Sequence, residues 1–205
     1  MRQALMMATD RDAMVTAVTS GLGVVAHAFI IPNAALFPEV ERAIVRYPYD
    51  PNRAAALLAD AGWQRSPGGN LSNAAGQALD IPIWTTPDGG GEQEAAILTD
   101  SWKTVGINSS QFMIPAVAQR DLELRASFPG VNPTSRSATL DNFVFDSGHL
   151  PTAAVLWQGA NRGSFVDPEV DRLLKLAQTS IDPLTHRDAV VGRSEERRVG
   201  KECRL

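Results

Sequence analysis

Residues 50–63 constrain the fold more than any other stretch, because they hold a complete helix with a signal at each end. Asp50 is a favourable N-cap, and Pro51 suits the first helical position, where its missing N–H is not needed. Apolar residues then recur at the spacing of one helical face: Ala54, Leu57, Leu58 and Ala61. Gly62 favours the left-handed conformation that ends a helix, and Trp63 can then pack on the last turn. The stretch therefore predicts a helix with one face on a core.

The same Asp-Pro signal occurs twice more. Asp167 and Pro168 open a predicted helix whose apolar face is Val170, Leu173, Leu174 and Ala177. Asp182 and Pro183 open another helix, which we expect residues 193–205 to break off.

A helix pair is predicted near the start of the chain. Residues 2–8 carry apolar side chains at helical spacing, and either Thr9 or Asp10 can cap a second helix that ends at Gly21. Residues 21–26 match the G-x-G-x-x-A dinucleotide fingerprint, but that motif needs a strand before it and a helix after it. A glycine turn that ends a helix is the better interpretation.

Residues 79–114 predict a strand, a helix and a strand in that order. Leu79, Ile81 and Ile83 alternate with other residues, and Pro82 places this strand at an edge or where its missing donor is not needed. The helix over residues 92–105 should turn these residues inward: Ala95, Ala96, Leu98, Thr99 and Trp102. A second strand is expected within residues 107–114, and this order favours parallel pairing.

The remaining segments predict a hairpin, a third strand and an irregular region. Residues 66–77 are rich in Gly, Ser and Asn, which mark a hairpin or a surface excursion. Residues 121–128 alternate apolar and polar residues, as a strand does. Residues 131–160 show no clear period, and long irregular stretches in a compact domain are often functional. Trp63 and Trp102 are interpreted as structural, while Trp84 suits a second packed layer or an interface.

Charge and cysteine content exclude several classes of function. The formal charge is −4, and the acidic balance argues against a nucleic-acid partner, which needs a clustered basic patch. The only cysteine is Cys203, so residues 1–192 have no thiol for a disulfide, a metal or catalysis. We found no H-E-x-x-H or G-x-S-x-G motif, and we expect neither a metal nor a cofactor.

Three segments together resemble a known family. Residues 2–15 (RQALMMATDRDAMV), 47–63 (YPYDPNRAAALLADAGW) and 164–177 (SFVDPEVDRLLKLA) are similar to family 5 of the bacterial extracellular solute-binding proteins. These are the oligopeptide, dipeptide and nickel receptors of ABC importers. The resemblance implies a mixed α/β fold, in which residues 1–192 form most of the second lobe of a type II periplasmic-binding-protein-like molecule, a small mixed sheet flanked by helices. We expect the chain to be an internal piece of a longer protein.

The last residues need a separate interpretation. Residues 193–205 (RSEERRVGKECRL) have no apolar period and resemble the translation of a sequencing adapter read in frame. We therefore treat them as a non-native tail. Without them the formal charge is near −6.

Candidate ligand-binding residues follow from a pocket's need for flat apolar walls and fixed polar groups. The segment 125–128 and the loop 157–162 offer them. The family's comparable strand delivers an arginine and an aromatic residue to the cleft, and by position these resemble Arg125 and Phe128. The predicted ligand-binding residues are Arg125, Phe128, Trp157, Asn161 and Arg162. Phe128 and Trp157 are alternatively core residues, and Arg162 is alternatively one half of a surface ion pair.

The resemblance implies a function in solute capture. The intact protein would be a monomer that binds peptides or similar small solutes outside the cytoplasm, in the periplasm or anchored to the membrane, and delivers them to an ABC permease. No bond would be made or broken. The alternative is a peptide or glycoside hydrolase domain. Its acid–base candidates are His149, the pair Asp141 and Asp146, and the group Asp167, Glu169 and Asp171. The simpler interpretation is structural: Asp167 caps a helix, and Glu169 and Asp171 favour the positive N-terminal end of that helix.

Overall fold

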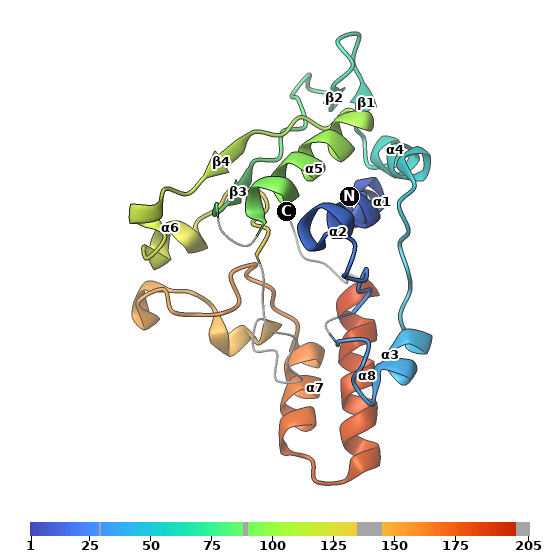
Figure 1. Cartoon of the computed structure of the whole chain (residues 1–205), viewed down its shortest axis with the longest axis vertical. Coiled ribbons are helices and arrows are strands. Elements are labelled where there is room, and N and C mark those ends of the chain that lie inside the picture. Colours follow the sequence, from blue (N-terminus) through green and yellow to red (C-terminus); the bar gives the residue numbers. More distant parts are fainter. Residues whose placement is uncertain (29, 88–89, 135–144, 200–205) are drawn as a thin grey trace. The chain divides into compact units, whose positions relative to one another are not determined.

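The computed structural model describes residues 1–28, 30–87, 90–134 and 145–199, with side chains up to residue 194. Helices and small sheets together confirm the predicted mixed α/β class (Figure 1). The chain divides into two compact units, which are described separately: unit 1 comprises Met1–Val25, Tyr47–Arg120 and Ser127–Ser135, and unit 2 comprises Ala26–Arg46, Asp121–Ala126 and Arg136–Leu205.

Unit 1 contains four α-helices and two small sheets among its described residues. Its elements are α1 (Arg2–Ala8), α2 (Arg11–Thr19), α4 (Pro51–Asp60), β1 (Gln64–Arg65), β2 (Leu71–Ser72), β3 (Ile83–Thr85), α5 (Gly91–Thr104), β4 (Gln111–Met113) and the 3₁₀ turn η1 (Ala116–Ala118).

Helix α4 confirms both predicted ends. The Asp50 carboxylate accepts the backbone N–H of Arg53 at 2.8 Å. At the other end Gly62 has φ +88°, its N–H bonds to the Ala59 carbonyl at 2.9 Å, and the Trp63 N–H bonds to the Leu58 carbonyl at 2.9 Å. This pair of bonds is a Schellman motif. The predicted face is right for its first three members but wrong for Ala61, which is exposed.

The helix pair α1 and α2 is also confirmed. Of the two candidate caps, Asp10 begins α2, because its carboxylate accepts the Ala13 N–H at 2.9 Å. Thr9 has another role: its hydroxyl donates to the Leu5 carbonyl at 2.8 Å and accepts the indole N–H of Trp102 at 3.0 Å. Trp102 is buried, so its interpretation as structural is correct. The Thr9–Trp102 contact ties α1 to α5.

Strands β3 and β4 form a parallel pair, and α5 is the crossover helix that joins them in the chain, as predicted (Figure 1). The register sets Ile83 opposite Gln111 and Trp84 opposite Phe112. On its other side β3 forms a parallel bridge to Val131, whose N–H bonds to the Pro82 carbonyl at 2.9 Å. The bonds toward the β4 side come from the N–H groups of Ile81 and Ile83, so the missing donor of Pro82 is not needed there.

The two faces of this sheet differ. Ile83 and Thr85 are buried on the side of the core, in which α5 places Ala95, Leu98 and Trp102. The prediction for Ala96 is wrong, because it is exposed, and the burial of Ser101 was missed.

Trp84 lies on the opposite face of the sheet from Ile83 and Thr85. Its ring centroid is 4.6 Å from that of Phe112, and the planes are tilted by 50°. Phe112 is 39% exposed, so this aromatic pair closes only part of the face. The segment after α4 forms the predicted hairpin, with β1 and β2 antiparallel.

The predicted strand over residues 121–128 is wrong. Residues Leu122–Ala126 form a short helix, α6, whose first turn is capped by the Asp121 carboxylate, which accepts the Leu124 N–H at 2.9 Å. The place beside β3 that a third strand would take is instead occupied at Val131. A capped turn satisfies the backbone locally, whereas a strand needs a neighbour with which to pair.

Unit 2 is mainly helical in its described residues. Its elements are α3 (Phe37–Ala43), α6, the 3₁₀ turns η3 (Ser147–His149) and η4 (Ala153–Val155), α7 (Pro168–Thr179) and α8 (Pro183–Val199). Helices α7 and α8 lie side by side (Figure 1). Their core is built from Ile30, Val40, Ile44, Leu173, Ala177, Ala189 and Val190.

Helices α7 and α8 begin at the prolines of the two Asp-Pro signals. The Asp167 carboxylate accepts the N–H groups of Glu169 and Val170, and all four predicted residues of the α7 face are buried. The Asp182 carboxylate accepts hydrogen bonds from the backbone N–H and the hydroxyl of Thr185. Both bonds lower the pKa of Asp182, and the bond from the hydroxyl has the larger effect. Helix α8 runs to Val199, beyond the expected break at residue 193, because Ser, Glu and Arg there are compatible with a helix.

The Schellman end of α4 gives a stability prediction. We expect Gly62→Ala to lower the free energy of unfolding by about 1 kcal/mol, because an L-residue resists a positive φ. A Cβ at Gly62 meets no atom within 4 Å, so the loss is conformational and not steric. Urea unfolding followed by circular dichroism measures it.

Gly68→Ala is the matched control, since Gly68 is outside the positive-φ region and its added Cβ would meet only the Ser66 hydroxyl at 3.9 Å. Equal stability of the two variants would contradict the role assigned to Gly62.

Candidate ligand-binding site

Three of the five predicted site residues lie in one loop of unit 2, between η4 and α7. Trp157 and Arg162 are half-buried in this loop, and Asn161 is only 1% exposed. The loop has no regular structure, so its shape depends on side-chain to backbone bonds and on close packing of the backbone.

Asn161 holds this loop together. Its amide donates to the backbone carbonyls of Asp146 at 3.1 Å and Phe165 at 2.6 Å, and its Oδ1 accepts the Phe165 N–H at 3.1 Å. Its own backbone N–H bonds to the His149 carbonyl at 3.0 Å. Both amide hydrogens are therefore used inside the loop. The side-chain amide of Asn161 therefore has no N–H left to donate to a ligand.

Gly159 allows this loop to cross the backbone of residues 149–151 at close range. A Cβ at Gly159 would lie 2.3 Å from the carbonyl oxygen of His149 and 2.4 Å from the nitrogen of Pro151. Any larger residue would push this loop away from residues 149–151.

Leu156 and Trp157 are in the left-handed region, with φ of 51° and 59°. Such a conformation costs a non-glycine residue about 1–2 kcal/mol, so the surrounding contacts must enforce it. The Trp157 N–H bonds to the Thr152 carbonyl at 2.9 Å, and the Leu156 N–H bonds to the Ala153 carbonyl at 3.1 Å. Leu156 is 71% exposed, which leaves an apolar side chain on the surface of a rigid turn.

The 3₁₀ turn η3 is anchored to α7 through Asp171. The Asp171 carboxylate accepts the backbone N–H of Ser147 at 2.9 Å and also the Ser147 hydroxyl. The sequence interpretation, in which acidic residues favour the start of this helix, missed this contact, because Ser147 is distant in the chain. Asp146 and His149 flank the anchor, with 3.5 Å between Oδ2 and Nδ1.

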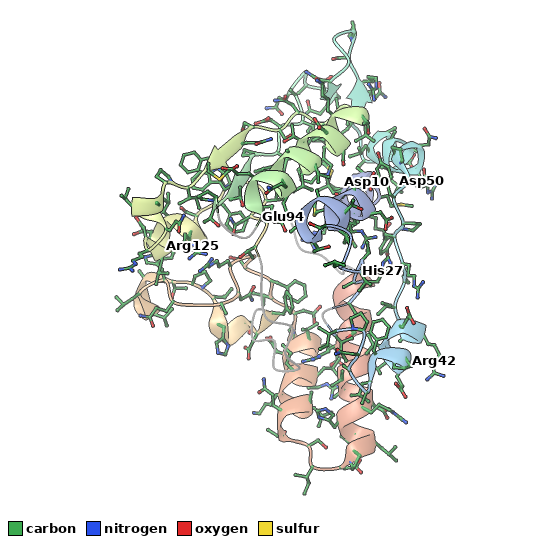
Figure 2. The ribbon with its side chains drawn as sticks, in the orientation of Figure 1. Asp10, His27, Arg42, Asp50, Glu94 and Arg125 are labelled. Carbon is green, nitrogen blue, oxygen red and sulfur yellow. The ribbon has the colours of Figure 1, made fainter. Side chains whose placement is uncertain are left out.

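Arg125 and Phe128 come from a different local structure than predicted. Arg125 is half-buried on helix α6, where Figure 2 labels it, and not at a strand end. Phe128 is half-buried and belongs to unit 1, whereas the other four residues belong to unit 2. Within unit 2, Trp157, Asn161 and Arg162 lie together in one loop. That all five contact a ligand stays a prediction.

The acid–base candidates of the hydrolase alternative are only partly described. Asp141 lies outside the described residues, while the Asp146 carboxylate accepts the Gly148 N–H at 2.7 Å and so caps η3. No group of three or more metal-ligating side chains occurs in the described part of the chain. Among those residues, no helix is both long and apolar enough to cross a membrane.

Comparisons with known proteins identify the class. Residues 1–141 match the family model described as "Bacterial extracellular solute-binding proteins, family 5 Middle". The chain belongs to this family. The family and the related proteins below are solute-binding proteins and not enzymes, so the hydrolase alternative is not favoured.

Two curated relatives agree with the family. A probable ABC transporter-binding protein of Deinococcus radiodurans is 31% identical over 108 residues, which are 52% of this chain and 18% of that protein. The oligopeptide-binding protein AppA of Bacillus subtilis is 24% identical over 189 residues, 88% of this chain and 33% of that protein.

A solved structure supports the fold. The oligopeptide-binding protein of Thermus thermophilus, crystallised with a pentapeptide, superposes with a TM-score of 0.79 and 25% identity, over 95% of this chain and 35% of that one. The chain thus spans well under half the length of each of these relatives.

Asn161 gives a prediction for the loop. We expect Asn161→Ala to lower the free energy of unfolding by about 2–4 kcal/mol, because it leaves the Asp146 carbonyl and both backbone polar groups of Phe165 without their bonds. The measurement is urea unfolding followed by tryptophan fluorescence. Gln158→Ala, an exposed change in the same loop, should stay near the wild type. If Asn161→Ala lowers the free energy of unfolding no more than the control does, the amide network contributes little to stability.

Glu94 gives a pH prediction in unit 1. This residue lies in the first turn of α5 (Figure 2), where partial burial raises the pKa of its carboxyl above the ordinary value. A carboxyl with a raised folded-state pKa stabilises the fold below the ordinary pKa of about 4.3, and this contribution is lost as pH rises through the folded value. Glu94→Gln should therefore be more stable than the wild type at neutral pH and equal to it in acid.

The test of Glu94→Gln is the difference in urea midpoint between variant and wild type across this pH range. Glu92→Gln removes an exposed charge from the same turn and should not stabilise, because acidic residues favour a helix N-terminus. A Glu94→Gln variant less stable than the wild type at neutral pH would contradict the burial argument.

Proposed function

We propose that the chain is part of the substrate-binding component of an ABC importer. That component captures peptides or similar small solutes outside the cytoplasm and delivers them to a membrane permease. The family match over residues 1–141 carries this proposal, and the fold shared with a pentapeptide-binding protein supports it. The protein acts as a monomer, in the periplasm or anchored at the outer face of the membrane.

The ligand-contacting residues proposed are Arg125, Phe128, Trp157, Asn161 and Arg162. The chemistry suits recognition without turnover: a guanidinium pairs with a carboxylate or a carbonyl, and an aromatic face packs on apolar parts of a solute. The Asn161 bonds and the Gly159 crossing support this assignment, because a rigid loop loses little entropy when it binds. The protein makes and breaks no bond in the solute.

An NMR titration of the isotope-labelled chain with short peptides tests the proposal. We expect weak binding, with a dissociation constant of about 1 mM or higher, because the chain spans a minor part of its relatives' length. Amide shifts should concentrate at residues 157–162 and should be lost in Arg162→Gln but kept in Gln158→Ala.

Two outcomes would count against this function. Shifts that are absent, or unchanged by Arg162→Gln, would remove the assigned site. Cleavage of the peptide in the same sample would replace binding by hydrolysis. The genes beside the coding sequence give an independent check, since permease and ATPase genes are expected there.

A further inference from the structure

A run of exposed apolar residues directly precedes the proposed solute loop in unit 2. Residues 153–156 (Ala-Ala-Val-Leu) form η4 and its C-cap, and all four are exposed. Val155 is 47% exposed and Leu156 is 71% exposed. Single exposed apolar residues are common on protein surfaces, but a run of this length is unusual unless it has a function.

The backbone holds this run in one conformation. The Gln158 N–H bonds to the Val155 carbonyl at 3.0 Å, which closes the turn across Leu156 and Trp157. Four of the described residues other than glycine have a positive φ, and three of them lie between η4 and α7: Leu156, Trp157 and Ser164. Unfavourable backbone conformations concentrate at ligand-binding sites, where the surrounding contacts enforce them.

The loop that follows the run carries little charge. Between residues 150 and 166 the only ionisable side chain is Arg162. Its proposed role is to pair with a carboxylate or a carbonyl of the solute, so the other groups that this loop offers are apolar or neutral. A charged solute side chain that is buried here gains no further partner from the loop, whereas an apolar one gains contact area with Val155 and Leu156.

We propose that Val155 and Leu156 select peptides that carry an apolar side chain, which packs on the exposed turn while Arg162 binds the peptide's carboxylate or a carbonyl. This inference rests on the proposed function and adds the class of solute, short peptides with a leucine-like side chain. Leu156 contributes most to the preference, because it is the more exposed of the two. The turn is already ordered, so little entropy is lost when a side chain packs on it.

An NMR titration of the whole chain with the peptides Ala-Leu-Ala and Ala-Asn-Ala tests this preference. Their central side chains are similar in size and differ in polarity. We expect Ala-Leu-Ala to bind about fivefold more tightly, which corresponds to burying roughly 40 Å² of apolar surface. Its amide shifts should extend from residues 157–162 to residues 153–156. Nuclear Overhauser contacts should join the methyls of the peptide's leucine to those of Leu156.

Leu156→Asn removes the apolar side chain and suits the left-handed backbone, which asparagine adopts more readily than leucine does. The variant should fold at least as stably as the wild type, which circular dichroism with urea measures. It should bind the two peptides with about equal affinity. Ile181→Asn is the matched control, because Ile181 is 99% exposed in the connection between α7 and α8, outside this loop. The control should keep the fivefold preference.

The outcomes separate this inference from the function on which it rests. Shifts at residues 157–162 with equal affinities for the two peptides would overturn the selectivity and leave the solute site in place. An unchanged preference in Leu156→Asn would do the same. The absence of shifts with either peptide would overturn both proposals.

Discussion

The structure depends first on satisfying the backbone N–H groups at the starts of its helices. An aspartate does so for α2, α4, α7 and α8, where Asp10, Asp50, Asp167 and Asp182 accept backbone hydrogen bonds. Each such cap stabilises its helix by about 1 kcal/mol, which decides whether a short helix forms at all. In three of these helices the next residue is proline, whose φ is already helical. Both units use this device, whereas α1, α3 and α5 have no side-chain hydrogen bond from the described residues at their N-caps.

Packing then determines which capped helices share a core. In unit 1 the parallel pair of β3 and β4 requires a crossover, and α5 supplies it while burying Ala95, Leu98 and Trp102. In unit 2, α7 contributes Leu173 and Ala177 and α8 contributes Ala189 and Val190 to one core. His186 on α8 adds a polar tie, with Nδ1 2.7 Å from the Ala177 carbonyl near the end of α7. Carbonyls at a helix end need such partners, because no further turn supplies an N–H.

The candidate solute site shows how a buried polar side chain fixes a segment that has no regular structure. In the loop around Asn161, the amide is fully bonded and the result is a rigid surface. A buried polar group whose hydrogen bonds are all made rigidifies the protein around it.

The sequence by itself determined both ends of α4, the starts of α7 and α8, the apolar face of α7, the order of strand, helix and strand in unit 1, and the family. These depend on neighbours within a few residues, such as Asp50 with Arg53 or Gly62 with Ala59, or on a period that local geometry imposes. Only the tertiary structure decided that residues 122–126 are a helix and that Val131 takes the place beside β3. It also decided that Asn161 bonds to Asp146 and that Ser147 bonds to Asp171. Alternation in a short segment fits either a strand or a capped turn, and the choice depends on whether a partner strand is within reach. Residues far apart in the chain make contacts that no local pattern encodes, because only the folded backbone brings their polar groups together.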